Sequence, residues 1–83
     1  AVQNTSLSLM PNPAKNKVTL HYSTRSGGII TIASAVGQII YNEKVATAGM
    51  SELSTQHWLQ GIYFVTLQSN AGDCLVQKLV IIK

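Results

Sequence analysis

The sequence predicts an all-β fold, an antiparallel β-sandwich of about seven strands. Short segments in which apolar and polar residues alternate are separated by turn residues roughly every 8–14 residues, as is typical of strands that bury one face. Valine, isoleucine and threonine account for 22 of the 83 residues, and these β-branched residues favour strands. No segment carries a convincing helical period. The length predicts one small domain.

Proline and glycine mark the ends of the early strands. The expected strands are Ser6–Met10, Lys17–Ser23, Ile29–Ala35, Gln38–Val45, Met50–Leu53, Gly61–Ser69 and Cys74–Ile82. The first strand ends at Pro11-Asn12-Pro13, because proline has no amide hydrogen to donate to a neighbouring strand. The second strand alternates most cleanly. Arg25-Ser26-Gly27-Gly28 forms the turn that follows, since paired glycines permit a positive φ.

The later strands differ in their expected exposure. The third strand is apolar on both faces, which predicts a central strand. Val36-Gly37 makes a tight hairpin into the fourth strand, and the fifth is a short edge strand. Gly61 opens the sixth strand, where a glycine indicates a positive φ or a close backbone approach. The expected buried core comprises Val18, Leu20, Tyr22, Ile30, Ile32, Ile40, Tyr63, Val65 and Leu67.

Composition and charge exclude several function classes. The net charge of +3 comes from only nine charged residues, and the cations are spread over both ends, so we expect no nucleic-acid partner. No apolar run approaches about 18 residues, so we expect no membrane span. No basic stretch followed by an apolar one opens the chain, so we expect no secretory signal peptide within it. Cys74 is the only cysteine, which excludes an internal disulfide and predicts a half-buried strand residue.

The residue chemistry gives no sign of catalysis. The residues with catalytic potential are His21, His57, Glu43, Glu52 and Asp73. Their spacing suggests neither a nucleophile–base–acid set nor a metal site. We therefore expect no enzyme, no cofactor and no metal, with the acids solvated at the surface. Trp58 is expected to close the open end of the sandwich, with a role in binding as the alternative.

Several stretches of the chain together form a pattern known from one family. They are Met10-Pro11-Asn12-Pro13-Ala14 with Val18-Thr19-Leu20, the hairpin Ile30 to Ile40, Leu59 to Val65, and Gln77 to Lys83. In this order they resemble the type A C-terminal sorting domain of the type IX (Por) secretion system of Bacteroidetes. Family-motif positions are Pro11, Asn12, Pro13, Gly37, Gly61, Ile62, Tyr63 and Val65. The family's ending is matched by the terminal motif Lys78, Leu79, Val80, Ile81, Ile82 and Lys83.

The resemblance implies a fold and a function. The fold would be an Ig-like sandwich over residues 6–83, with residues 1–5 as a linker that follows a cargo domain. The function would be a secretion signal recognised by outer-membrane secretion and sortase-like components, commonly cleaved off with surface attachment of the cargo. The protein would be exported through the periplasm to the outer membrane, the cell surface or the medium. An adhesin or carbohydrate-binding module, and a signalling domain that reports export status, remain as alternatives.

The last expected strand is the natural recognition element. Its run Leu79-Val80-Ile81-Ile82 is apolar on both faces. If the strand lies at a sheet edge, unpaired backbone groups would be available to a receptor by strand addition, and edge strands would also allow a dimer. If the strand is central, two covered faces explain the same pattern. The residues alone leave both interpretations open.

Overall fold

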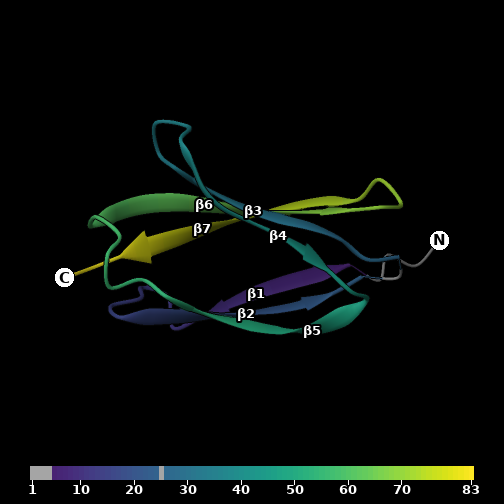
Figure 1. Ribbon diagram of the computed structural model, residues 1–83, viewed down its shortest axis with the longest axis horizontal. Helices are drawn as coiled ribbons and strands as arrows, with labels where there is room; N and C mark the ends of the chain where they lie inside the picture. The colour runs from purple at the N-terminus through teal and green to yellow at the C-terminus, as the bar shows by residue number, and fades with distance from the viewer. Residues whose placement is uncertain (1–4, 25) are drawn as a thin grey trace.

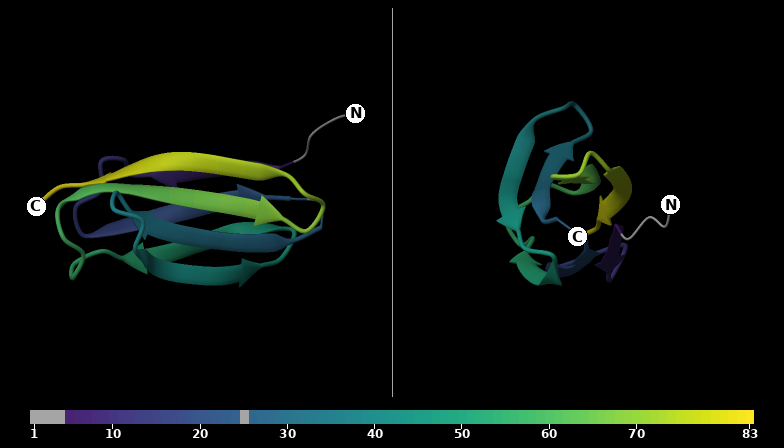
Figure 2. Two further views of the ribbon diagram at one scale, coloured as in Figure 1. Left: turned by 90° about the horizontal axis from the view of Figure 1, so that it is seen from above. Right: turned by 90° about the vertical axis from the view of Figure 1, so that its right-hand side faces the viewer.

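Seven β-strands form two antiparallel sheets in the computed structural model, which describes residues 5–24 and 26–83. The strands are β1 (Ser6–Met10), β2 (Lys17–Ser23), β3 (Gly28–Ser34), β4 (Ile39–Val45), β5 (Ala48–Ser54), β6 (Gly61–Ser69) and β7 (Cys74–Ile81). One sheet has the order β1-β2-β5 and the other β4-β3-β6-β7. The sheets stack as two layers (Figure 1), with β4 and β7 at the edges of the larger one (Figure 2). The predicted seven-stranded sandwich is confirmed.

Two predicted segments fall partly outside the described residues. Of the linker expected at residues 1–5, only Thr5 is described, and its hydroxyl donates a hydrogen bond to the Asp73 carboxylate at 2.9 Å. Of the expected turn between β2 and β3, Arg25 lies outside the described residues. Gly27 in that turn has a φ of 75°, the conformation for which a glycine was expected.

Most strands begin and end close to where the alternation predicts. β3 lies between β4 and β6, which confirms its predicted central position. β5 is the main difference, because it runs from Ala48 to Ser54 and not only from Met50 to Leu53. It pairs with β2 along its whole length. Its small residues carry no alternation signal, so backbone pairing extends the strand beyond what side chains indicate.

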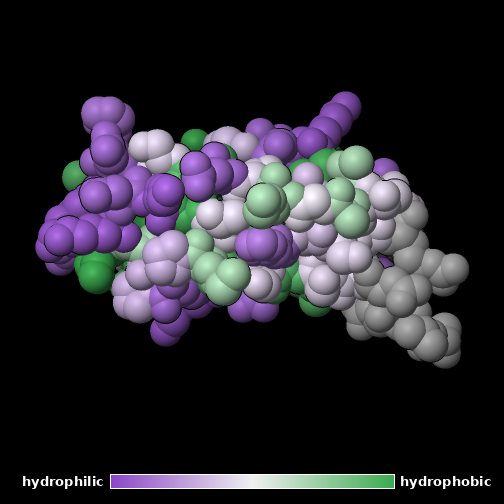
Figure 3. Space-filling view, turned by 90° about the horizontal axis from the view of Figure 1, so that it is seen from below, coloured by the Kyte–Doolittle hydropathy of each residue, from purple (hydrophilic) through white to green (hydrophobic). Residues whose placement is uncertain are grey.

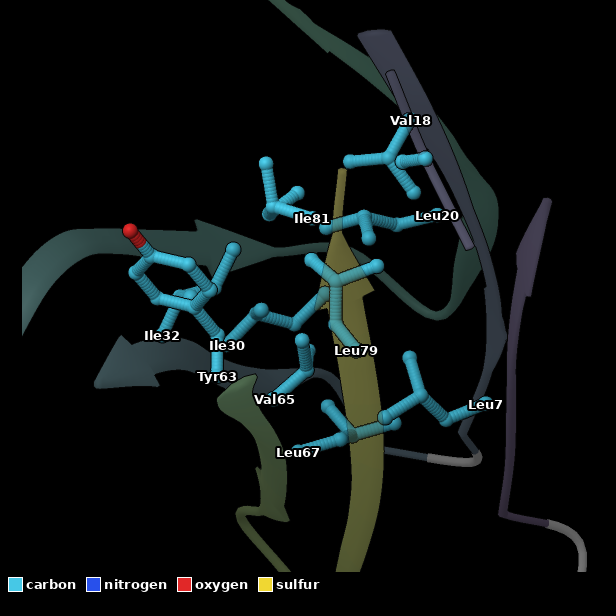
Figure 4. Packing of buried hydrophobic residues seen from close by; sticks show 11 residues of the cluster. Leu7, Val18, Leu20, Ile30, Ile32, Tyr63, Val65, Leu67, Leu79 and Ile81 are labelled. Atoms are coloured by element: carbon cyan, nitrogen blue, oxygen red, sulfur yellow. The ribbon is translucent and has the colours of Figure 1, made fainter. Parts of the chain in front are cut away.

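The core lies between the two sheets. Its buried apolar residues are Leu7, Ala14, Val18, Leu20, Ile30, Ile32, Tyr63, Val65, Leu67, Leu79 and Ile81. Side chains from both sheets point toward one another in this cluster (Figure 4). Tyr22, predicted to be buried, is only half-buried against it. The prediction for Ile40 is wrong, because Ile40 adjoins the inward-facing Tyr41 and so has the phase of the exposed Asn42 and Lys44, and it is 36% exposed. A β-bulge after Ile32↔Tyr41 also leaves Ile40 without a pairing partner on β3.

The β3–β4 hairpin turns at Gly37, as predicted. The Ser34 N–H donates to the Gln38 carbonyl at 2.8 Å, and the Gly37 N–H donates to the Ser34 carbonyl at 2.9 Å. Gly37 has a φ of 91°, which residues with a side chain rarely adopt. The glycine of this family-motif position therefore serves the turn geometry.

Candidate functional site

The terminal motif begins in the second half of β7 and ends two residues beyond it, and β7 is an edge strand. Among the described strands it pairs only with β6, which decides between the two interpretations of its sequence. Leu79 and Ile81 point inward and are fully buried (Figure 4). Val80 and Ile82 alternate with them on the outer face, where Ile82 is 44% exposed. The strand is apolar on both sides although only one side is covered by a second sheet.

The segment between β1 and β2 covers the edge of β7. The Asn12 side-chain amide donates to the Lys78 carbonyl at 2.8 Å, and its side-chain oxygen accepts from the Val80 N–H at 3.0 Å. The Ala14 N–H donates to the Val80 carbonyl at 2.8 Å, and the Ala14 carbonyl accepts from the Ile82 N–H at 2.9 Å. Four outward-pointing backbone groups of β7 are therefore paired.

The residue types of the β1–β2 segment explain how it can pair with the backbone edge of β7. An asparagine side chain has one carbonyl and one amide group, so Asn12 satisfies β7 much as a peptide group of a neighbouring strand would. Ala14 is fully buried and makes a parallel bridge with Ile81. Pro13 lies between them in a bend of the chain, and because proline has no amide hydrogen it leaves no donor unpaired there. From the sequence, the prolines indicate only the end of a strand, because the covering role of Asn12 depends on a strand 66 residues further along the chain.

The covered edge corrects the expectation of unpaired backbone groups. A partner strand can pair with β7 between Lys78 and Ile82 only by displacing Asn12 and Ala14. Considering residues 5–24 and 26–83, the outward backbone groups of Cys74 and Val76 have no such partner. The open part of this edge therefore precedes the terminal motif.

Lys83 fastens the end of the motif to the connection between β5 and β6. Its ammonium donates to the carbonyls of Thr55 at 2.9 Å and Gln56 at 3.0 Å. Its backbone N–H donates to the side-chain oxygen of Gln60 at 3.2 Å. Thr55 is fully buried, so these bonds tie the motif to a fixed part of the sandwich.

The outward side chains of β6 and β7 form an apolar patch around one lysine. This outer patch comprises Ile62, Phe64, Val76, Lys78, Val80 and Ile82. Strand pairing places Ile62 opposite Val80 and Phe64 opposite Lys78, which joins the β6 family motif to the terminal motif. Ile62 is 43% exposed and Phe64 40%. The intervening motif residues Tyr63 and Val65 face the core and are buried.

One acid, Glu43, lies between the sheets and not at the surface as expected. Its carboxylate accepts hydrogen bonds from the Tyr41 hydroxyl at 2.5 Å and from the Ser51 hydroxyl of the other sheet at 3.1 Å. The pKa of Tyr41 is raised to about 12, mainly by burial. The hydrogen bond to Glu43, the negative charge of Glu43 and the neighbouring Tyr22 raise it further. This cluster joins β4 to β5 across the side of the sandwich opposite β7.

The remaining acids also lie away from the outer patch. Glu52 is on the outer face of the three-stranded sheet, 3.5 Å from the Lys17 ammonium. Asp73 is in the β6–β7 turn. Within the described part of the chain, the outer face of the four-stranded sheet carries Lys44 and Lys78 and no carboxylate. That face is positive as well as apolar.

Trp58 closes one end of the sandwich, as predicted. Its half-buried ring packs against the core with its centroid 5.4 Å from that of Tyr63. The Tyr63 hydroxyl donates to the Leu59 carbonyl at 2.5 Å. At Gly61 the backbone has a φ of 151° and open space around the missing side chain, which confirms the positive φ and not the close approach.

The structure reveals no grouping of residues suited to metal chemistry in the part of the chain that it describes. No three side chains of His, Cys, Asp or Glu there lie close enough together to hold an ion. Cys74 is exposed on the outer face of β7 and not half-buried as predicted. Among the same residues, none belongs to a helix of the length and apolarity that crossing a membrane requires.

The family assignment follows from a comparison with known families. A model described as the secretion system C-terminal sorting domain, of the Por type, matches residues 8–83. The chain belongs to this family. The match spans the Asn12 cover, the β6 motif and the terminal motif alike. A search of curated proteins finds no match.

The Por sorting domain is a signal and belongs to a non-catalytic family. It targets cargo to the Por, or type IX, secretion system, so that the protein is exported to the cell surface or beyond. Its partners in general are therefore a cargo and the secretion machinery. The secretion machinery must therefore recognise some part of the surface of this domain.

Proposed function

We propose that residues 6–83 are the type A sorting signal of a cargo protein and that residues 1–5 are its linker. The cargo crosses the periplasm, and outer-membrane components then recognise the folded domain. A sortase-like peptidase cuts within or before the linker and leaves the cargo at the surface or outside. The family match over residues 8–83 supports this assignment.

We further infer that recognition uses the outward side chains of the terminal motif, namely Lys78, Val80 and Ile82. The observation that carries this inference is that different parts of β7 have different contacts. Leu79 and Ile81 are buried in the core, and the backbone edge is hydrogen-bonded to Asn12 and Ala14. The outward side chains of Lys78, Val80 and Ile82 therefore remain accessible to a receptor, whereas the Lys83 ammonium is already bonded to Thr55 and Gln56.

A carbohydrate-binding module is less well supported. Sugar sites are usually lined by aromatic faces. Here Tyr63 is buried, Trp58 is packed against it, and Tyr22 and Tyr41 are half-buried beside the core. Phe64 is the aromatic with the most exposed position, and it stands alone opposite Lys78.

The experiment should not delete the motif. A deletion of Val80–Lys83 removes the fully buried Ile81 and the partners of Asn12 and Ala14, so lost export would not separate recognition from unfolding. Point variants with exposed side chains avoid this problem. Lys78→Glu and Ile82→Ser change the outer face, and surface substitutions of this kind usually alter stability by about 0.5 kcal/mol or less.

Each variant is fused to a reporter in cells that carry the Por system, and the purified domain is melted in parallel. We expect both variants to melt close to the parent and to leave much of the reporter inside the cell. Met50→Ser is the matched control, because Met50 is 66% exposed on the other sheet. It should be exported normally. Full export of Lys78→Glu and Ile82→Ser would contradict recognition through the terminal motif.

A further inference from the structure

We propose that the outer patch is a docking surface that extends beyond the terminal motif, and that its occupant is a protein surface with an apolar centre and an acidic rim. The inference rests on the proposed function and adds the chemistry of the partner. It assigns a receptor-facing role to Ile62, Phe64 and Val76, which lie outside the terminal motif.

The two outer faces of the sandwich differ in character. Antiparallel sandwiches usually present polar side chains to solvent. The three-stranded sheet mostly follows this pattern, because its outward residues are small or polar apart from the exposed Met10 and Met50. Hydrophilic or near-neutral residues predominate on the side shown in Figure 3. The four-stranded sheet does not, because β6 and β7 direct isoleucine, phenylalanine and valine outward. Since the same chain produces both faces, the apolar one is a specific feature and not a general property of its composition.

The apolar side chains of the patch are contiguous. On β7, Val76, Lys78 and Val80 occupy alternate positions and so share one face, and Ile82 continues the alternation directly after the strand ends. Directly opposite, Phe64 lies against Lys78 and Ile62 against Val80. Val76 is 58% exposed, the most of the apolar members. Clustered exposed apolar residues with a large aromatic near the centre are typical of binding sites.

Lys78 determines what the occupant must provide. A partner that covers the patch also removes water from the ammonium group beside Phe64, and burial of an unpaired charge is strongly unfavourable. The described outer face offers Lys78 no carboxylate, because Glu43 is turned between the sheets and Glu52 lies on the other sheet. The occupant must therefore bring its own acidic groups.

The same charges argue against a second copy of this domain on the patch. A two-fold contact would bring Lys44 and Lys78 of one copy against those of the other, with no acid on either described face. Edge pairing at the terminal motif is opposed as well, because Asn12 and Ala14 already occupy the β7 edge there. A different, acidic protein surface fits both observations.

The first experiment identifies the occupant in cells. A photo-crosslinking amino acid replaces Phe64, Val76 or, as control, Met50 of the full fusion protein, and crosslinked products are identified by mass spectrometry. We expect one product shared by positions 64 and 76 and absent at position 50, joined to a protein segment that contains acidic residues. Products that are equal at all three positions, or a product made only of this chain, would overturn the proposal.

The second experiment tests the charge requirement on that product. Lys78→Glu should reduce crosslinking from position 76 by about tenfold or more, the range for losing a charge-paired contact at an interface. Lys78→Arg should retain it, and Lys17→Glu on the other sheet should have no effect. Equal crosslinking by Lys78→Glu and the parent would refute the proposal that the partner surface is acidic.

A third set of measurements separates this inference from the proposed function. If Ile82→Ser blocks export while Phe64→Ser and Val76→Ser fold and are exported normally, the terminal motif is read but the larger docking surface is refuted. Sedimentation with phosphatidylglycerol vesicles should show no Lys78-dependent binding, and analytical ultracentrifugation should show a monomer. Vesicle binding that requires Lys78, or a dimer that Phe64→Ser dissociates, would replace the protein partner with a lipid surface or a second copy.

Discussion

The covering role of Asn12 makes the most specific prediction about this fold. Asn12→Ala removes both side-chain hydrogen bonds to β7 and leaves the Lys78 carbonyl and the Val80 N–H to water. A single such bond contributes about 0.5–1.5 kcal/mol net, and these two are exposed, so we expect the free energy of unfolding to fall by about 1–2 kcal/mol. For a domain of this size that corresponds to a fall in Tm of roughly 5–15 °C.

The place in the structure where Asn12→Ala loosens the backbone is as informative as the size of the fall in stability. The Val80 N–H points to Asn12, whereas Leu79 pairs with Tyr63 of β6. Hydrogen exchange followed by NMR should therefore accelerate at Val80 in Asn12→Ala, with a smaller change at Leu79. Asn12→Asp keeps an acceptor for Val80 but loses the donor to Lys78, so its Val80 amide should remain better protected than in Asn12→Ala. Unchanged exchange at Val80 in Asn12→Ala would refute the covering role.

Three further predictions concern the core, the backbone and pH. Ile81→Ala should lower the free energy of unfolding by about 2–5 kcal/mol in denaturant titrations, because Ile81 is fully buried, and a loss under 1 kcal/mol would remove β7 from the core. Gly61→Val should cost about 1–3 kcal/mol through backbone strain at a φ of 151°, and an unchanged melting midpoint would contradict it. The raised pKa of Tyr41 means that the folded state holds this proton more tightly than the unfolded state, so stability present below about pH 10 is lost as pH rises toward 12. Tyr41→Phe should show a shallower fall in Tm over that interval, and identical slopes would indicate that lysines and other groups alone cause it.

The alternation of side chains determined the strands and most of the core. In β2, and in β6 from Val65 to Gln68, apolar residues alternate with polar ones, so Val18, Leu20, Val65 and Leu67 were assigned correctly to the buried face. This information is local, because successive side chains of a strand point to opposite faces whatever the strand pairs with. Turn residues such as Gly37 are equally local, since their φ depends on the residue itself.

Alternation fails where both faces are apolar or where the register changes. Leu79, Val80, Ile81 and Ile82 contain no polar residue to mark the outer face, so the sequence was compatible with an edge strand and with a central one. Ile39 and Ile40 are adjacent apolar residues, so the local sequence does not mark which of them faces the core, and a bulge changes the register with β3 at this point. A bulge depends on how β4 meets β3, which no single strand reveals.

Only the tertiary structure decided how the terminal motif is presented. Asn12 and Lys78 are 66 residues apart, and the bonds that pair the β7 edge form only when the two sheets bring these segments together. The same is true of the outer patch, because Phe64 meets Lys78 through strand register. Local sequence sets which residues alternate, whereas strand order and register, which depend on the whole chain, set which of them remain available to a partner.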